Sequence, residues 1–248
     1  MRFNDHFSSH AAGYAKSRPT YPAALFAELA AMAPDRALAW DAGSGNGQAA
    51  VALADHFARV VASEPSAEQL AQQIIHPKVT YVQAAETLAA LADGSVDLIT
   101  VAQAVHWFDR PTFFAEVRRV ARPNAVVAVW TYTLCHIAAE VDAVVSRFYE
   151  QTIGAYWPPE TLHCINGYRD LDFPFDEMPF PKLAMELVWS LDEYVDYIAT
   201  WSAVARYKHA TGHDPMPPLR AELAGPWGEA ATRRRILWPL PGRLGRVV

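Results

Sequence analysis

Cysteine is scarce in this chain of 248 residues, which contains only Cys135 and Cys164. Two cysteines are too few for a disulfide framework. No apolar run is long enough to span a membrane, and the opening residues, MRFNDHFSSH, lack the basic and then apolar layout of a secretory signal peptide. We therefore expect a cytoplasmic protein without a membrane partner.

Positive charge is also limited in this sequence. The 21 lysines and arginines are outnumbered by 27 aspartates and glutamates, and the net charge is −6. Such a chain has no broad attraction to a phosphate backbone, so we expect no nucleic-acid partner. The arginine run at residues 233–235 is typical of a solvated face beside a terminal strand. Nothing in the sequence indicates an oligomeric state.

Apolar residues, in contrast, are abundant. Their spacing along the chain alternates between the pattern typical of strands and the pattern typical of helices. They make up 52% of the chain, which is enough for one α/β domain with a sizeable core. The expected strands lie at residues 37–42, 59–63, 79–82, 96–102 and 126–130. The expected helices lie at residues 23–32, 48–57, 67–75 and 111–121. This alternation predicts βαβ units and a parallel sheet, which binds ligands at the carboxyl ends of its strands.

The pattern changes after Tyr132. We expect a helix over residues 138–152, followed by a long segment over residues 154–181 that is rich in proline and aromatic residues. A connection of this length is typical of a lid or binding loop, so we expect it to cover a site. Beyond it the sequence predicts a strand at 183–190, helices at 192–207 and 218–224, and a closing strand or hairpin at 236–247.

A glycine-rich turn connects the first expected strand to the helix that begins at residue 48. It consists of Asp41, Ala42, Gly43, Ser44, Gly45, Asn46, Gly47 and Gln48. Glycines at such a turn permit positive φ angles and let a ligand contact bare backbone, while the helix N-terminus supplies unpaired N–H groups. The third glycine of the dinucleotide fingerprint is replaced by Gln48, and no G-x-x-x-x-G-K-[ST] pattern occurs. The turn therefore favours a nucleotide-type ligand but argues against a dinucleotide.

An acidic residue ends the second expected strand. Glu64 lies 21 positions beyond Gly43 and precedes Pro65. Because neighbouring parallel strands end at the same edge of a sheet, its carboxylate is expected beside the glycine turn, where it can accept hydrogen bonds from both ribose hydroxyls of an adenosine. The turn and the acid together predict an adenosine-containing ligand.

With these motifs the sequence resembles the class I S-adenosylmethionine-dependent methyltransferases, and within them the methyltransferase type 11, trans-aconitate methyltransferase-like group. The resemblance is carried by residues 3–7, 18–22, 41–47, 64–66, 85–86, 97–109, 116–120, 200–203 and 238–240. It implies an α/β fold with a Rossmann-like, doubly wound sheet of seven mostly parallel strands and an antiparallel C-terminal strand. It also implies an N-terminal helical lid, an insertion after the fifth strand, and S-adenosyl-L-methionine as cofactor.

On this resemblance we expect a single methyltransferase domain over residues 1–248. Its parts are a lid at 1–34, a cofactor-binding core at 35–135, a helix and cap insertion at 136–182, and C-terminal strands and helices at 183–248. The implied cofactor-binding residues are Asp41, Gly43, Ser44, Gly45, Gly47, Gln48, Glu64, Pro65, Ala85, Glu86 and Gln103, with Tyr14 and Arg18 of the leader. The glycine turn would receive the methionine part, Glu64 the ribose, and residues 84–86 the adenine.

The candidate catalytic residues follow the fourth expected strand and are Gln103, His106 and Trp107. Methyl transfer from a sulfonium depends on alignment and exclusion of water rather than on acid–base work, and it needs no metal. His106 either deprotonates an acceptor hydroxyl, orients a carboxylate, or is structural. We expect a small-molecule acceptor, with O-methylation of a carboxylate as one option. The candidates to hold an anionic acceptor are Arg18, Arg169, Arg206 and His136.

Three alternatives compete with this interpretation. An NAD-dependent oxidoreductase shares the fold and the acid on the second strand, but the third glycine and a Tyr-x-x-x-Lys pair are absent. A nucleic-acid or protein-amide methyltransferase would carry Asn/Asp-Pro-Pro-Tyr where residues 103–106 read Gln-Ala-Val-His. A non-catalytic protein that binds S-adenosylmethionine or S-adenosylhomocysteine stays open, because binding can outlast catalysis.

Overall fold

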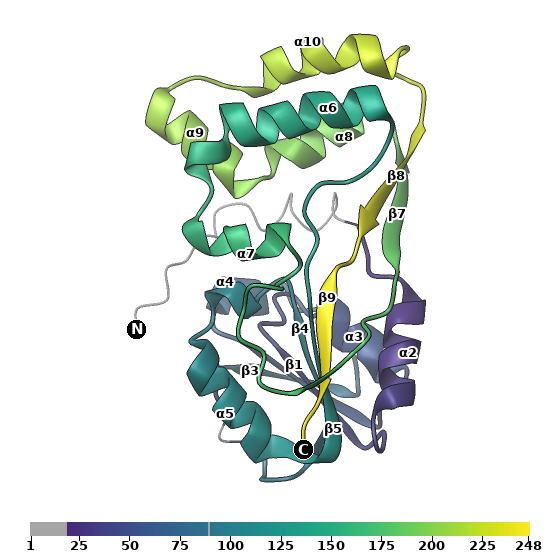
Figure 1. Ribbon diagram of the computed structural model, residues 1–248, viewed down its shortest axis with the longest axis vertical. Coiled ribbons are helices and arrows are strands. Elements are labelled where there is room, and N and C mark those ends of the chain that lie inside the picture. Colours follow the sequence, from purple (N-terminus) through teal and green to yellow (C-terminus); the bar gives the residue numbers. More distant parts are fainter. Residues whose placement is uncertain (1–18, 89) are drawn as a thin grey trace.

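The computed structural model describes residues 19–88 and 90–248. Its central feature is a seven-stranded sheet of order β3-β2-β1-β4-β5-β9-β6 (Figure 1). The strands are β1 (Leu38–Ala42), β2 (Arg59–Glu64), β3 (Val79–Gln83), β4 (Val96–Ala102), β5 (Ala121–Trp130), β6 (Asp176–Met178) and β9 (Gly242–Arg246). Strands β1 to β5 pair in parallel, and β9 lies antiparallel between β5 and β6. The expected Rossmann-like, mostly parallel sheet with an antiparallel C-terminal strand is confirmed.

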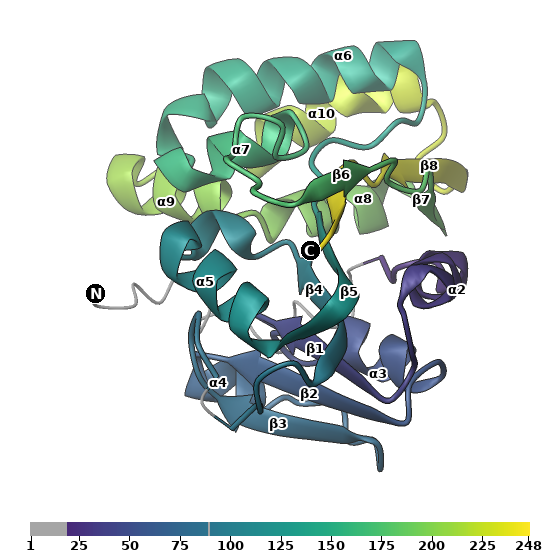
Figure 2. The same cartoon turned by 60° about the horizontal axis from the view of Figure 1, so that its bottom comes forward.

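Helices cover both faces of this sheet, which is why its central strands are almost continuously apolar. Successive side chains of a strand point to opposite faces, so β5 sends Val126 and Ala128 into one core and Val127 and Val129 into the other. The helices α2 (Ala23–Met32) and α3 (Gln48–Ala54) line the first core, and α5 (Arg110–Val120) lines the second. Figure 2 shows α5 on one side of the sheet and α2 and α3 on the other.

A second layer lies above the sheet in Figure 1. It contains α6 (Ala139–Arg147), a π-helical turn η3 (Phe148–Thr152), α8 (Leu191–Ala199), α9 (Ser202–Thr211) and α10 (Met216–Trp227). It also contains a separate antiparallel pair, β7 (Ala184–Trp189) with β8 (Arg234–Pro239). Between the two layers runs the segment over residues 154–181, hereafter the cap segment, with the short helical turns η4 (Gly154–Tyr156), η5 (Pro159–Thr161) and α7 (Leu162–Ile165).

Several expected helices differ in the structure from the sequence pattern. The helix expected over 48–57 ends at Ala54, and the helix expected over 138–152 becomes the π-helical turn η3 from Phe148. The helix expected over 67–75 ends early as α4 (Ala67–Leu70), which has no buried residue. Beyond it Ile74 N donates to Asn46 O at 2.9 Å instead of continuing the helix, and Ile75 is 89% exposed. The helix expected over 192–207 is two helices, because Trp201 is extended at φ −68° and ψ 136° and packs its buried ring against Tyr149.

The strand predictions also need correction. The cap segment contributes β6, a strand of three residues that the sequence analysis missed. The segment over 236–247, expected to be one closing strand or a hairpin, instead contains parts of two strands that belong to different sheets. Strand β8 pairs with β7, strand β9 pairs with β5, and Pro241 lies between β8 and β9. Strand β5 begins at Ala121 rather than at residue 126, and Ala121 pairs with Val96 of β4.

The arginine run at the start of β8 is engaged with neighbouring side chains. Arg233 pairs with Glu193 at 2.9 Å and Arg235 pairs with Glu186 at 2.5 Å. Arg234 lies over the ring of Trp227, 5.6 Å from its centroid. Over residues 19–88 and 90–248, no helix combines the length and apolarity needed to cross a membrane.

Candidate functional site

The glycine turn between β1 and α3 has a backbone that only glycine adopts without strain. Gly43, Gly45 and Gly47 have φ angles of +66°, +56° and +93°. A Cβ atom on Gly47 would lie 2.0 Å from Tyr81 Oη, and one on Gly43 would lie 2.6 Å from Ala104 Cβ. The turn is therefore pressed between β3 and the loop after β4, and no side chain fits at either glycine.

The carboxylate of Glu64, at the end of β2, lies directly beside this turn. Its Oε2 accepts a hydrogen bond of 2.9 Å from Gly45 N, and its Oε1 accepts one of 3.0 Å from Ser66 N. Ser44 N donates to Ser63 O at 3.0 Å, which holds the turn against the strand. The structure thus brings the predicted acid and the predicted glycine turn into contact, and Pro65 follows, half-buried, at the same edge.

Asp41, at the end of β1, lies beneath the turn and is fully buried. Thr100 Oγ1 donates to its Oδ1 at 2.7 Å. Burial, with a smaller contribution from the charge of Glu64, raises the pKa of Asp41 to about 7, although Thr100 and the Ala50 backbone act against the rise. Within the described part of the chain, Asp41 Oδ2 and Ser44 Oγ are buried without a hydrogen-bond partner.

Unpaired buried polar atoms are rare in folded proteins, and each one needs an explanation, of which a bound ligand is one. Here two of them lie at a turn of bare backbone beside a carboxylate. Such a set of donors and acceptors fits a ligand that carries both hydroxyl groups and a cationic amine. S-adenosylmethionine has both, so the residues present fit the cofactor that the sequence implies. Gln48, half-buried at the first position of α3, lies at the same turn.

The segment after β3, where the adenine is expected, is held by two contacts. Ala84 N donates to Glu64 O at 3.2 Å. Glu86 Oε1 accepts a hydrogen bond of 3.0 Å from Asp109 N, so this carboxylate ties the segment to the start of α5. Ala85, between them, is exposed. Of the two predicted adenine-side residues, Glu86 is therefore already engaged with the protein.

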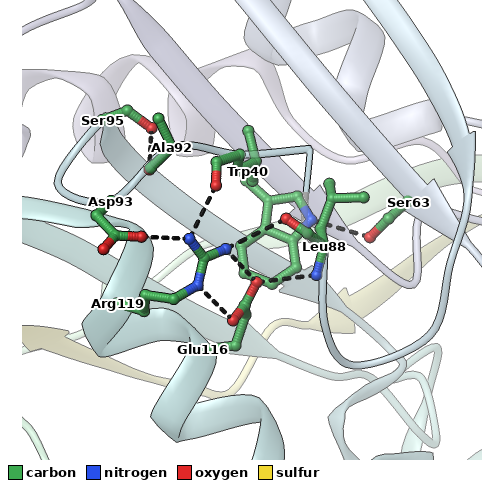
Figure 3. A network of polar contacts seen from close by, with 9 residues as sticks. Trp40, Ser63, Leu88, Ala92, Asp93, Ser95, Glu116 and Arg119 are labelled. Carbon is green, nitrogen blue, oxygen red and sulfur yellow. Dashed lines mark hydrogen bonds and ion pairs between the residues drawn. The ribbon is translucent and has the colours of Figure 1, made fainter.

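A network of polar contacts centred on α5 also fixes the segment after β3, at Leu88, Leu91 and Asp93 (Figure 3). Glu116 Oε1 accepts from Leu88 N at 2.9 Å and from Arg119 Nη2 at 2.6 Å. Arg119 in turn donates to Leu88 O at 3.3 Å, to Leu91 O at 2.9 Å and to Asp93 Oδ1 at 2.5 Å. The hydrogen bond from Arg119 lowers the pKa of Glu116 below its ordinary value. We call this set of contacts the α5 clamp.

Gln103 follows β4 with an unusual backbone, at φ +59°. Its Nε2 donates to Tyr132 O at 2.7 Å, and its Oε1 accepts from Tyr132 N at 3.2 Å and from Thr131 Oγ1. Both ends of the amide are thus used to join the ends of β4 and β5. In the structure this predicted site residue is a bridge between two strand ends.

His106 lies in the 3-10 turn η2 (Val105–Trp107) and is only 5% exposed. Its Nδ1 lies 2.9 Å from Tyr168 Oη and 3.5 Å from Cys164 Sγ. Burial, with smaller contributions from the charges of His163 and Arg110, lowers the pKa of His106 to about 3. The imidazole is therefore neutral at physiological pH. The ring of Trp107, half-buried, is tilted against it at a centroid distance of 4.8 Å.

Sequence reasoning missed Tyr168 and Cys164 as partners of His106. They lie 62 and 58 positions after it, in the cap segment. No spacing rule connects residues so far apart in the sequence. The sequence considered by itself relates Cys164 only to disulfide formation. The one available signal was the aromatic richness of the cap segment, which indicated a covered site without indicating which ring meets which side chain.

The residues predicted to hold an anionic acceptor are dispersed. Arg169 is exposed and Arg206 is half-buried. The side chain of His136 is 67% exposed and lies 3.5 Å from Asp142. Tyr14 and Arg18 lie outside the described residues. Across residues 19–88 and 90–248, no three His, Cys, Asp or Glu side chains gather in a way that could hold a metal ion.

Comparison with known proteins identifies the family of this chain. A family model described as a methyltransferase domain matches residues 40–129. A protein assigned as a methyltransferase in Dictyostelium discoideum is 35% identical over 226 residues, which cover 90% of this chain and 86% of that protein. A solved structure assigned as a type II methyltransferase from Anaeromyxobacter dehalogenans is 45% identical with a TM-score of 0.88, covering 93% of this chain and 98% of that one.

This chain belongs to the class I S-adenosylmethionine-dependent methyltransferases. The cofactor of this methyltransferase is S-adenosylmethionine, as the sequence implied. A Saccharomyces cerevisiae protein named as an S-adenosylmethionine-dependent methyltransferase is also similar, at 28% identity over 138 residues that cover 52% of this chain and 47% of that protein. Membership of the methyltransferases rules out the NAD-dependent oxidoreductase that shares this sheet architecture.

Proposed function

We propose that this methyltransferase binds its cofactor between the glycine turn and Glu64 and methylates a carboxylate oxygen of a small molecule. The bare backbone of Gly43 to Gly47 would receive the methionine part, with the unpaired Asp41 Oδ2 and Ser44 Oγ as polar partners. Glu64 would hold the ribose, and residues 84–86 would flank the adenine. When bound, the cofactor supplies an electrophilic methyl group on a sulfonium.

The state of His106 supports a carboxylate acceptor. An imidazole with a pKa of about 3 is too weak a base to take a proton from a hydroxyl or an amine at neutral pH. Its Nδ1 is also engaged by Tyr168, at 2.9 Å. A carboxylate is already ionised at neutral pH and needs no base. The observation that carries the proposal is therefore the burial of the neutral His106 among Tyr168 and Cys164.

Aromatic rings line the place that we propose for the methyl acceptor. Tyr149 of η3, Trp157 of the cap segment and Trp201 pack together, with centroid distances of 4.9 Å between Tyr149 and Trp157 and 5.9 Å between Trp157 and Trp201. The Nε1 atom of Trp157 is buried and has no hydrogen-bond partner within the described residues. An indole N–H can only donate, so it would suit an acceptor oxygen. Such rings also exclude water from a methyl-transfer centre.

A small molecule fits this arrangement better than a polymer. The helix α7 of the cap segment lies between the sheet and the upper layer, and a net charge of −6 gives no general attraction to nucleic acids. The resemblance to trans-aconitate methyltransferases likewise favours a small carboxylic acid. The substrate class is thus proposed from the covered, aromatic acceptor side and from the absence of a usable base at His106.

A coupled assay for S-adenosylhomocysteine release tests the proposal on a panel of small carboxylic acids, phenols and amines. We expect turnover with a carboxylic acid and, at saturating S-adenosylmethionine, a flat pH–rate profile from about pH 6 to 9. Turnover restricted to phenols or amines, with a steep pH dependence, would contradict the carboxylate. Tight cofactor binding without turnover of any acceptor would favour the non-catalytic alternative.

A further inference from the structure

Tyr168 connects the cap segment to the loop after β4. It is fully buried, and its Oη lies 2.9 Å from His106 Nδ1. The two rings also stack, at a centroid distance of 5.9 Å and an interplanar angle of 29°. Cys164 Sγ donates toward the same Oη at 3.8 Å. The phenol is therefore the shorter of two polar contacts through which the cap segment reaches His106, the other being that of Cys164 Sγ at 3.5 Å.

The contacts continue from Tyr168 to the end of β5. The Tyr168 hydroxyl also interacts with the side chain of Thr131. Thr131 Oγ1 donates to Gln103 Oε1, the same oxygen that accepts from Tyr132 N. Because a backbone N–H can only donate, the orientation of the Gln103 amide is fixed, and so is the donor role of Thr131. These hydrogen bonds at the end of β5 thus hold in place Thr131, the side chain that neighbours the Tyr168 hydroxyl.

Backbone strain marks two members of this set of contacts. In the part of the molecule that the structure describes, only Gln103, Asn124 and Tyr168 are non-glycine residues with positive φ. Gln103 and Tyr168 both belong to the set, at φ +59° and +66°. Such conformations persist only where the surroundings over-determine them, and they cluster at active sites. The strain at Tyr168, the hydrogen-bond partner of His106, indicates that the placement of His106 is specified rather than incidental.

The turn that His106 occupies packs on the cofactor site. Ala104 and Phe108 lie on either side of η2, and a Cβ atom on Gly43 would lie 2.6 Å from Ala104 Cβ and 3.0 Å from Phe108 Cζ. No space separates η2 from the glycine turn. A displacement of the imidazole would therefore move the wall of the proposed methyl-transfer centre.

We infer that Tyr168 is a positioning residue for methyl transfer, whose hydroxyl holds the His106 imidazole in one neutral tautomer and so fixes η2 against the glycine turn. The inference rests on the proposed placement of η2 beside the methyl-transfer centre. Either direction of the hydrogen bond between Oη and Nδ1 selects a single tautomer. Tyr168 acts through His106, and the aromatic ring alone, without the hydroxyl, does not provide this selection.

The variant Tyr168→Phe tests the inference, because it keeps the ring and removes only the hydroxyl. We expect kcat with the accepted carboxylic acid to fall at least tenfold, while the Kd for S-adenosylmethionine changes less than threefold. Nitrogen NMR of the imidazoles, assigned with His106→Gln, is expected to change from one His106 tautomer to a mixture. The matched control is Tyr207→Phe, whose ring packs edge-on against Tyr156 at 5.1 Å in the upper layer.

A double-mutant cycle separates positioning from general destabilisation. If Tyr168 acts through His106, the double variant Tyr168→Phe, His106→Gln loses no more activity than His106→Gln alone. Additive losses would overturn the inference, as would wild-type kcat in Tyr168→Phe. The nitrogen NMR spectrum of His106 can be recorded without a methyl acceptor. A single tautomer in Tyr168→Phe therefore overturns the inference even if no carboxylic acid is turned over.

Discussion

Glu64 Oε2 lies 2.9 Å from Gly45 N, so the last residue of β2 is hydrogen-bonded to the middle of the turn that follows β1. The second carboxylate oxygen is held by Ser66 N at 3.0 Å. Two backbone donors therefore fix the carboxylate before any ligand arrives. This relationship is the geometric basis for the proposed ribose contact at the edge formed by β1 and β2.

Replacement of Glu64 tests that site directly. A hydrogen bond to a charged group contributes about 1.5 to 3 kcal/mol, so Glu64→Ala is expected to weaken S-adenosylmethionine binding by at least tenfold in calorimetry. The exposed Glu28→Ala on α2 is the matched control and should bind normally. Unchanged affinity in Glu64→Ala, with the fold intact by melting temperature, would show that the ribose is held elsewhere.

Gly47→Ala is expected to disrupt the start of α3. The new Cβ atom would lie 2.0 Å from Tyr81 Oη at a φ of +93°, so both a clash and backbone strain oppose it. Strain of this kind costs about 1 to 3 kcal/mol before the clash is counted. Gly94→Ala separates the two effects, because Gly94 has a φ of +60° but open space around it. The melting temperature should fall further for Gly47→Ala, and equal losses would mean that Tyr81 moves aside freely.

Asp41 makes the stability of the ligand-free protein depend on pH. Its pKa rises from an ordinary value of 3.8 to about 7 in the folded state because the carboxyl is buried. Between these values the folded state binds more protons than the unfolded state, so stability falls as the pH rises through this window, by roughly 4 kcal/mol in total. Asp41→Asn should remove this fall, and urea unfolding at pH 5 and pH 8 measures the part of it above pH 5, which is roughly 3 kcal/mol.

The same substitution should weaken cofactor binding. An ionised Asp41 beside Ser44 favours a ligand that carries positive charge, so the wild-type affinity for S-adenosylmethionine should rise as the pH passes 7. In Asp41→Asn the affinity should be lower and nearly independent of pH. A variant that is more stable at pH 8 yet binds as tightly as wild type would contradict the proposed role of Asp41.

The α5 clamp is expected to support the adenine side from a distance. Arg119→Gln removes the donors to Leu88 O and Leu91 O. Since each such bond contributes about 0.5 to 1.5 kcal/mol, we expect the Kd for S-adenosylmethionine to rise about three- to tenfold. Arg118→Gln is the control on the same helix, because Arg118 donates to Pro174 O instead. Equal Kd values for the two variants would show that the clamp serves only folding.

Local signals in the sequence were sufficient for the five parallel strands and for the contact between the glycine turn and Glu64. The period of the apolar residues placed β1 to β5 to within a few residues, apart from the early start of β5. Gly43 and Glu64 each follow a strand, and parallel strands end together, so their proximity follows from pattern and topology. The boundaries that failed are those decided by packing, such as the end of α4 at Leu70, where no partner buries the next turn.

The sequence by itself thus determined a parallel sheet, a glycine turn and an acid at its edge, because each depends on residues close together or on a rule of topology. Tertiary structure alone decided the surroundings of His106. The contacts of Tyr168 and Cys164 with that ring join residues 62 and 58 positions apart, and no local pattern encodes which side chains a folded cap segment brings together. Burial among those partners, rather than the identity of the residue, makes the imidazole neutral.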